Sequence, residues 1–339
     1  MNLVYKARQC FVRALDSDEP AEKMREDWKT WLEYFNDRLR DLNFDFSQVE
    51  HELEETSKEA EQHSEYRHFC IDNFLALSEH ALYCNCVGAR SDDLSIPPRG
   101  HPISGEFVPL MELYLNRIKS EFALARYLFY QSTTASNTEV DTINSEVNFT
   151  ELFEKEAIGL RGEMLRISFR LCFGILDKIA HGICDLFDLA DKNENIYFER
   201  FWKPRGKNLT EKQSSRWTKI NKLKNFPLFA LYSQATDLNT SNGEWGIFKE
   251  WRNALEHEMV ILTTKDTFST KQYQFLEVDD TAVTIEYENF VQKTLHLLQL
   301  TCSAIFNYTF CVRIEGIKHL EKNGSRGKKI TFYPKNFAG

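Results

Sequence analysis

Apolar residues recur every three or four positions over much of the chain, which is the spacing that predicts amphipathic α-helices. The strongest pattern runs through residues 151–190, and others cover residues 3–45, 66–87, 110–131 and 288–320. The apolar positions of the strongest pattern are Leu165, Phe169, Phe173, Leu176, Ile179, Ile183, Leu186 and Phe187. We therefore predict a mainly α protein, built as a multi-helix bundle around these faces.

Strand-forming residues concentrate in one region near the C-terminal end. The segments 259–264, 272–278 and 282–287 are rich in β-branched and aromatic residues, and Asp279 and Asp280 mark a turn between the last two. We therefore expect a small β-hairpin inserted into the bundle, directly after a helix that contains residues 250–258.

Loop-forming residues divide the chain. The span from Ile96 to Gly105 contains three prolines and two glycines, which predicts a loop. We place an N-terminal helical region at residues 1–105, a helical domain at residues 106–320 and a basic tail at residues 321–339. Residues 132–147 are rich in Ser, Thr and Asn and predict a polar linker, with a long loop inside a single domain as the alternative.

Composition indicates a globular protein of the cytoplasm. Hydrophobic residues make up 42% of the 339 residues and only 8 are prolines, so a core can form and long disorder is not expected. No apolar run approaches the roughly 18 residues of a membrane span, and residues 1–6 lack the apolar core of a signal peptide. We expect the 8 cysteines to be buried free thiols, and we expect no metal and no cofactor.

The net charge of −9 is unevenly distributed. Residues 1–150 contain 27 acidic and 15 basic residues, whereas residues 151–339 contain 24 acidic and 27 basic ones. The second half therefore tolerates a polyanionic ligand much better than the first.

Basic and aromatic residues alternate between Arg200 and Lys224. Nine basic residues accompany one acidic residue there, and Trp202 and Trp217 lie among them. Cations pair with phosphates and rings stack on bases, so the pattern predicts contact with single-stranded RNA. The alternative is a solvated basic loop whose tryptophans belong to the core. The candidate RNA-binding residues are Lys203, Arg205, Lys207, Arg216 and Lys219.

One predicted helix carries residues suited to phosphodiester chemistry. Arg252 is followed directly by Asn253 and, after three more residues, by His257. Asn253 and His257 share a helix face, and the long side chain of Arg252 can reach the same site. A second pair, Arg313 and His319, has similar spacing but lacks the polar neighbour, and chance alone predicts about as many such pairs as occur.

Both candidate groups have simpler interpretations. Arg252 and Glu256 form an ordinary intrahelical ion pair if His257 is only a surface residue. Asp177 lies one turn before His181 on the strongest predicted helix, where the two can form a local pair or Asp177 can point into a composite site. Spacing along the sequence leaves these alternatives open.

Five separated stretches of the chain carry a resemblance to a known family: Tyr66–Cys70, Glu121–Arg126, Leu176–Ala180, Pro227–Ser233 and Arg252–His257. In this order they resemble the HEPN superfamily (higher eukaryote and prokaryote nucleotide-binding), and within it the LA-type HEPN proteins, a family of predicted ribonuclease toxins. The resemblance covers roughly residues 66–310, and residues 1–60 carry no matching motif.

The resemblance implies a HEPN-like helical bundle that forms a homodimer, in which the Arg–His motifs of two protomers meet in a composite cleft. It implies metal-independent cleavage of RNA to 2′,3′-cyclic phosphate and 5′-hydroxyl ends, with His257 as general base and acid. Arg252 would hold the scissile phosphate, Asn253 would position the phosphate or the histidine, and Asp177 would join the site. Because the chain is acidic, RNA binding would depend on the basic segment near residues 200–224.

Three functions are compatible with these observations. The expected one is an endoribonuclease toxin of an antiviral (abortive infection) defence or a toxin–antitoxin system, with RNA as substrate and an antitoxin as partner. The second is a non-catalytic helical RNA-binding or protein-interaction module. The third is a subunit of a larger defence complex, docked through the acidic residues 48–65.

Overall fold

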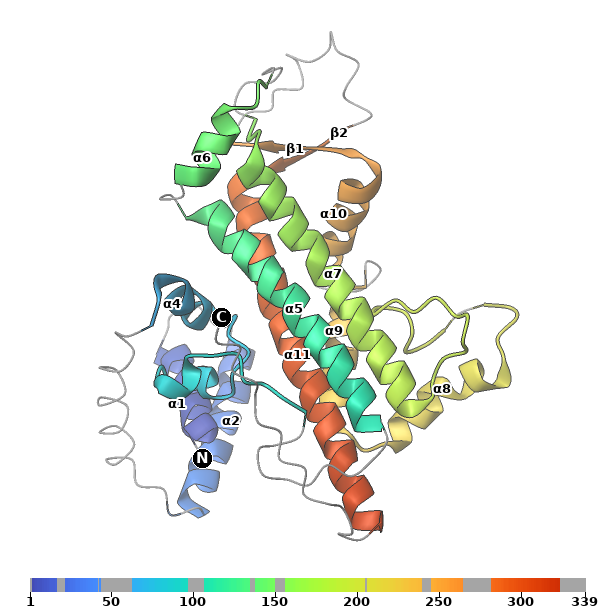
Figure 1. Cartoon of the computed structure of the whole chain (residues 1–339). Coiled ribbons are helices and arrows are strands. Elements are labelled where there is room, and N and C mark those ends of the chain that lie inside the picture. The colour runs from blue at the N-terminus through green and yellow to red at the C-terminus, as the bar shows by residue number, and fades with distance from the viewer. Residues whose placement is uncertain are drawn as a thin grey trace. The chain divides into compact units, whose positions relative to one another are not determined.

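The chain is predominantly helical in its computed structural model (Figure 1), which confirms the predicted mainly α class. Two compact units make it up, Met1–Asp93 and Leu94–Gly339. The expected boundary between residues 105 and 106 and most of the expected basic tail fall outside the described residues. The structure describes residues 2–16, 22–41, 43, 63–96, 107–134, 138–149, 156–204, 206–239, 245–264 and 282–323.

The first unit contains a pair of packed helices, α1 (Asn2–Asp16) and α2 (Glu22–Asp41). Tyr5 and Leu39 form a small buried core there. The apolar pattern predicted over residues 3–45 only partly faces this core, because Trp31 is 52% exposed and packs on neighbouring aromatic rings. The described part of this unit also contains three short elements: α4 (Glu65–Asp72) and the 3-10 turns η1 (His80–Leu82) and η2 (Val87–Ala89).

Three long helices form the centre of the second unit. α5 (Phe107–Thr133) packs against α7 (Leu160–Phe187), and α11 (Tyr287–Asn323) packs against both (Figure 1). α9 (Phe226–Asp237) lies on α11 and has a proline in its first turn. Of the apolar positions predicted to face the core along α7, all but Leu186 are buried. The period of the sequence pattern therefore identified the packed face of this helix.

A single tyrosine joins the three long helices. Tyr308 of α11 is buried, and its hydroxyl donates a hydrogen bond of 3.2 Å to the carbonyl oxygen of Met111 in α5. On the other side its ring lies against Gly182 of α7, where an added Cβ atom would be 2.8 Å from the ring. Glycine is needed at this position because any larger residue would push α7 and α11 apart.

The predicted polar linker at residues 132–147 contains a helix, so that prediction is wrong in part. Asp141 of this helix pairs with Arg161 of α7 at 3.0 Å, and Asn144 accepts a hydrogen bond from the backbone N–H of Leu160 at 3.0 Å. These contacts attach the segment to the bundle, which composition alone cannot reveal. The shorter helices of this unit are α6 (Thr138–Ser145), α8 (Glu211–Lys222) and α10 (Gly246–His257).

A two-stranded sheet follows α10, as predicted. β1 (Met259–Thr263) pairs with β2 (Ala282–Glu286). The strands run parallel, with Met259 opposite Ala282, whereas a hairpin would have paired them antiparallel. Parallel strands need a long crossover, and residues 264–281 are long enough to supply one. The strand predicted at residues 272–278 and its turn lie outside the described residues.

Among the residues that the structure describes, one helix is apolar enough to resemble a membrane span. Residues Tyr287–Lys318 of α11 meet the length and composition of such a span. In the fold, 61% of the apolar window is buried inside the protein. A core helix of a bundle has the same properties, so the window is only a weak sign of a membrane segment.

Candidate functional site

The predicted motif helix is present as α10, and its burial pattern decides which residues face outward. Phe248, Trp251 and Ala254 are buried. The Phe248 ring lies 6.1 Å from that of Phe169 on α7, and the Trp251 ring lies 5.5 Å from that of Phe290 on α11. These contacts fix α10 against the bundle and leave the opposite face for polar side chains.

Arg252 turns inward, toward α7. Its side chain is 20% exposed, and its Nη2 lies 4.0 Å from Asp177 Oδ2. Its Nε donates to Glu256 Oε1 at 3.4 Å, and the guanidinium lies 5.2 Å from the centre of the Phe173 ring. The guanidinium is therefore surrounded by two carboxylates and one aromatic face.

Asp177 is positioned by α7 and by the segment that follows it. Its Oδ1 accepts a hydrogen bond of 2.9 Å from the backbone N–H of Phe198. Burial raises the pKa of Asp177, an effect that this hydrogen bond and Arg252 oppose and the nearby Glu199 reinforces. The structure thus brings Asp177 together with Arg252, while His181, its sequence neighbour on the helix, is exposed.

Asn253 and His257 lie at the exposed side of α10. His257 is the last residue of the helix, and its side chain is 75% exposed. Its Nε2 lies 4.0 Å from Glu256 Oε2, while the other carboxylate oxygen of Glu256 faces Arg252. Glu256 therefore approaches both motif residues, a role beyond the plain ion pair that its spacing predicted.

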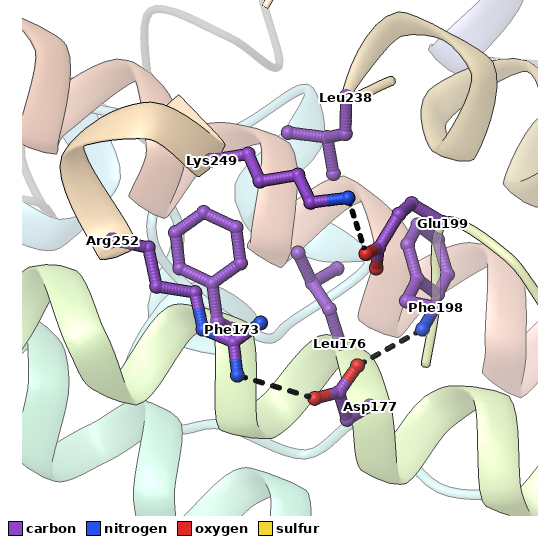
Figure 2. Close-up of a pocket in the computed structure, with 8 residues that line it drawn as sticks. All are labelled: Phe173, Leu176, Asp177, Phe198, Glu199, Leu238, Lys249 and Arg252. Carbon is purple, nitrogen blue, oxygen red and sulfur yellow. Dashed lines mark hydrogen bonds and ion pairs between the residues drawn. The ribbon is translucent and has the colours of Figure 1, made fainter. Parts of the chain in front are cut away.

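A small pocket lies at the inner side of Arg252 (Figure 2). Its empty space amounts to about 260 Å³, part of it open to solvent. Lys249, one turn before Arg252, reaches Glu199 at 2.8 Å in this pocket, and both side chains are nearly buried. Sequence analysis missed these two residues, although the spacing of Lys249 and Arg252 places them on one helix face. The lining residues are Phe173, Leu176, Asp177, Phe198, Glu199, Leu238, Lys249 and Arg252.

Two of the predicted RNA-binding residues have structural contacts. Arg216 has no exposed side-chain surface; it pairs with Glu194 at 2.6 Å and donates to the carbonyl oxygens of Leu189 and Phe201. Its prediction as an RNA contact is therefore withdrawn. Lys219 donates to the carbonyl oxygen of Phe187 at 2.5 Å, where a lysine stabilises the C-terminal end of α7.

Two of the other predicted basic contacts lie at the surface. Lys203 and Lys207 are exposed, and Arg205 lies outside the described residues. The Lys203 ammonium lies 4.4 Å from the centre of the Trp217 ring, which in turn packs 4.4 Å from Tyr232. Cation, tryptophan and tyrosine thus form one surface group. Trp202, by contrast, is buried, as the core interpretation required.

In the second Arg–His pair, the arginine, Arg313, has a structural role. Arg313 Nε donates to the carbonyl oxygens of Ser95 and Ile96, at 2.8 and 3.0 Å. The side chain of His319 lies outside the described residues. Arg313 therefore fixes the segment before α5, whereas Arg252 lines a pocket.

Cysteines show no special arrangement. All eight are free thiols, and five of them are buried as expected. Cys10 is exposed, and Cys84 and Cys86 are half-buried. Within the described ranges, no three His, Cys, Asp or Glu side chains are grouped so that they could hold a metal ion.

Comparison with protein families gives one match, to a family described as LA2681-like HEPN, over residues 104–315. No curated protein and no solved structure matches the chain. The match includes Asp177, Arg252 and His257, and four of the five resembling stretches; Tyr66–Cys70 lies before it. Since the matched part is more than half of the chain and folds as a helical bundle, the chain belongs to the LA2681-like HEPN family.

Proposed function

We propose that this chain is a metal-independent endoribonuclease whose site is built on α10. HEPN domains are often ribonucleases, the matched residues 104–315 include Arg252 and His257, and the spacing of these two residues resembles the family's Arg–His motif. The observation that carries the proposal is that the carboxylate of Glu256 lies 3.4 Å from Arg252, which lines a pocket, and 4.0 Å from the exposed imidazole of His257 at the helix end. A fixed cation and an accessible imidazole are the two groups that phosphodiester transesterification requires.

Each residue has a chemical role in this proposal. The guanidinium of Arg252 binds the scissile phosphate and stabilises the charge that develops on its oxygens. His257 removes the proton of the ribose 2′-hydroxyl or protonates the leaving 5′-oxygen. Attack by the 2′-oxygen on phosphorus then yields a 2′,3′-cyclic phosphate and a 5′-hydroxyl end. Asn253, exposed beside them, orients the phosphate or the imidazole, and Asp177 orients Arg252 from the pocket.

The two proton transfers favour a site shared by two protomers. One histidine acts as base while another acts as acid, and each chain supplies a single His257. The 75% exposure of His257 leaves its imidazole accessible to a second protomer. We therefore propose a homodimer with a composite site, in which the two α10 helices face each other.

Cleavage of a labelled single-stranded RNA in excess EDTA tests this proposal. We expect the wild type to produce 2′,3′-cyclic phosphate ends, and His257→Ala to lower the rate by about 10²-fold or more. His296→Ala, which removes another exposed histidine, is the matched control and should cleave normally. Equal cleavage by wild type and His257→Ala would show that any activity comes from a contaminant or another site.

The proposed biological role is that of a toxin in antiviral defence or a toxin–antitoxin pair. Expression in a bacterial host should arrest growth and fragment RNA with the wild type but not with His257→Ala. If neither protein has an effect, the site is either inactive or held off, and the next experiment asks which partner releases it.

A second candidate is a non-catalytic RNA-binding module. It is favoured by the surroundings of Arg252, whose guanidinium already faces the carboxylates of Asp177 and Glu256. An RNA phosphate must compete with both. This alternative predicts RNA binding without turnover, and RNA cleavage that Arg252→Ala abolishes would exclude it.

A further inference from the structure

Three contacts form a closed circuit around the pocket (Figure 2). Arg252 of α10 faces Asp177 of α7, and Asp177 accepts the backbone N–H of Phe198. The next residue, Glu199, pairs with Lys249, which returns the circuit to α10. The segment between α7 and α8 is thereby held to α7 through Phe198 and to α10 through Glu199.

The Lys249–Glu199 pair is the tightest part of this circuit. Its atoms are 2.8 Å apart, and the two side chains are only 14% and 10% exposed. Water screens such a pair far less than a surface pair, so it resists separation. The Arg252–Asp177 contact is longer, at 4.0 Å, and more open to solvent. The short pair can therefore set the geometry of the long one.

The backbone explains how this influence reaches the motif arginine. Because Glu199 follows Phe198 directly, fixing its side chain to α10 also fixes the Phe198 N–H that holds Asp177 Oδ1. With one oxygen held, the other carboxylate oxygen of Asp177 is directed at Arg252. If the anchor is lost, Asp177 loses its donor and Arg252 loses its partner.

We propose that Glu199 and Lys249 are positioning residues: their ion pair holds Asp177 and keeps Arg252 aligned to receive a phosphate group of RNA. The part that concerns RNA rests on the proposed ribonuclease function. Neither side chain acts on the reacting atoms, so both act through Arg252.

The test uses the full-length chain and four variants. Lys249→Met breaks the pair, whereas Lys249→Arg keeps the charge and is the conservative rescue. Glu199→Gln/Lys249→Met removes both charges and leaves no buried ion unpaired, which guards against misfolding. Glu250→Gln, an exposed neighbour on the same helix, is the matched control.

The first measurement does not depend on activity. With arginine labelled by nitrogen-15, the Nη–H signals of Arg252 can be assigned by their loss in Arg252→Lys, and Nη2 is the nitrogen that faces Asp177. We expect their hydrogen exchange to accelerate about tenfold in Lys249→Met and the double variant, because an ordered carboxylate partner protects them. Lys249→Arg and Glu250→Gln should resemble the wild type. An unchanged exchange rate in both Lys249→Met and the double variant would overturn the proposal.

The second measurement is RNA affinity in the His257→Ala background, where cleavage is expected to be slower by about 10²-fold or more. Lys249→Met should weaken binding about tenfold, equivalent to about 1.4 kcal/mol. In an Arg252→Ala/His257→Ala background, Lys249→Met should not weaken RNA binding any further. An equal loss there would mean that Lys249 contacts RNA itself, which contradicts a positioning role. If the wild type neither binds nor cleaves RNA, the proposed function fails, and arginine exchange alone decides the positioning proposal.

Discussion

Arg216 and Arg252 are both withdrawn from solvent, but their surroundings differ. Arg216 is fully enclosed, and its donors contact Glu194 and two carbonyl oxygens at 2.6 to 2.8 Å. Arg252 retains 20% exposure, and its carboxylate contacts measure 3.4 and 4.0 Å. Short, enclosed contacts cost several kcal/mol to break, whereas longer contacts at a pocket wall can exchange for a phosphate. Burial and distance therefore separate a structural arginine from a candidate functional one.

The substitution Asp177→Asn should slow RNA cleavage without lowering the stability of the folded protein. Burial raises the pKa of Asp177 above its usual 3.8, so the folded protein disfavours the carboxylate. The stabilising effect of the neutral form is complete below pH 3.8 and is lost as pH rises through the raised pKa. The asparagine stays neutral and keeps an acceptor for Phe198. At pH 7 the variant should be at least as stable as the wild type, yet cleave RNA more slowly.

Urea unfolding of both proteins between pH 4 and pH 7 measures this difference. We expect the stability advantage of Asp177→Asn to grow with pH. An advantage that shrinks as pH rises would mean that the Arg252 ion pair outweighs the burial of Asp177.

At the scale of elements, α10 divides its residues among three environments. Trp251 packs into the bundle, Arg252 lines the pocket and His257 ends the helix in solvent. A helix advances by about 100° per residue, so neighbours in the motif necessarily point in different directions. This geometry explains how one short helix can be anchored, line a pocket and still present a histidine to another surface.

Two glycines of α7 should respond oppositely to substitution by alanine. A Cβ at Gly182 would lie 2.8 Å from Tyr308, whereas one at Gly174 would meet only the end of Lys178, at 3.8 Å. We expect Gly182→Ala to lower the free energy of unfolding by about 1–3 kcal/mol, because it forces α7 and α11 apart. Gly174→Ala should raise it by about 0.5–1 kcal/mol, because alanine favours the helix. Thermal unfolding of both variants tests the pair; a stabilised Gly182→Ala would contradict the close packing.

At the scale of the whole molecule, a chain with a net charge of −9 is proposed to bind a polyanion. The acidic excess lies in residues 1–150, while Lys203 and Lys207 are exposed in the other half. Because salt screens exposed charges beyond about 8–10 Å, local lysines can dominate binding even though the total charge is negative. Binding of this kind should weaken strongly with salt.

Salt titration of RNA affinity tests the two exposed lysines. Each phosphate contact contributes a slope of about 0.7 to the fall of log affinity with log salt for single strands. Lys203→Ala and Lys207→Ala should therefore each reduce the slope by about 0.7, measured by fluorescence anisotropy in the His257→Ala background. Lys29→Ala, an exposed lysine in α2, is the control and should leave the slope unchanged. Unaltered slopes in both test variants would remove the basic segment from the RNA site.

The sequence by itself determined the helical class, the buried face of α7 and the helix that carries Arg252 and His257. These follow from local physics, because a 3.6-residue period and helix-forming residues act within a few turns. Family membership was also visible, since several short stretches kept their order along the chain. Local patterns could not reveal that β1 and β2 run parallel, because pairing depends on the path of the crossover between them.

Only the tertiary structure decided which charged side chains are enclosed and which partners they meet. Arg216 and Lys203 look alike in a basic segment, but Arg216 is buried in an ion pair with Glu194. Lys203 lies over the ring of Trp217 at the surface. Glu199 and Lys249 are 50 positions apart, so no spacing rule connects them, yet they close the circuit around the pocket. Electrostatic roles depend on distance and burial, and the packing of distant segments fixes both.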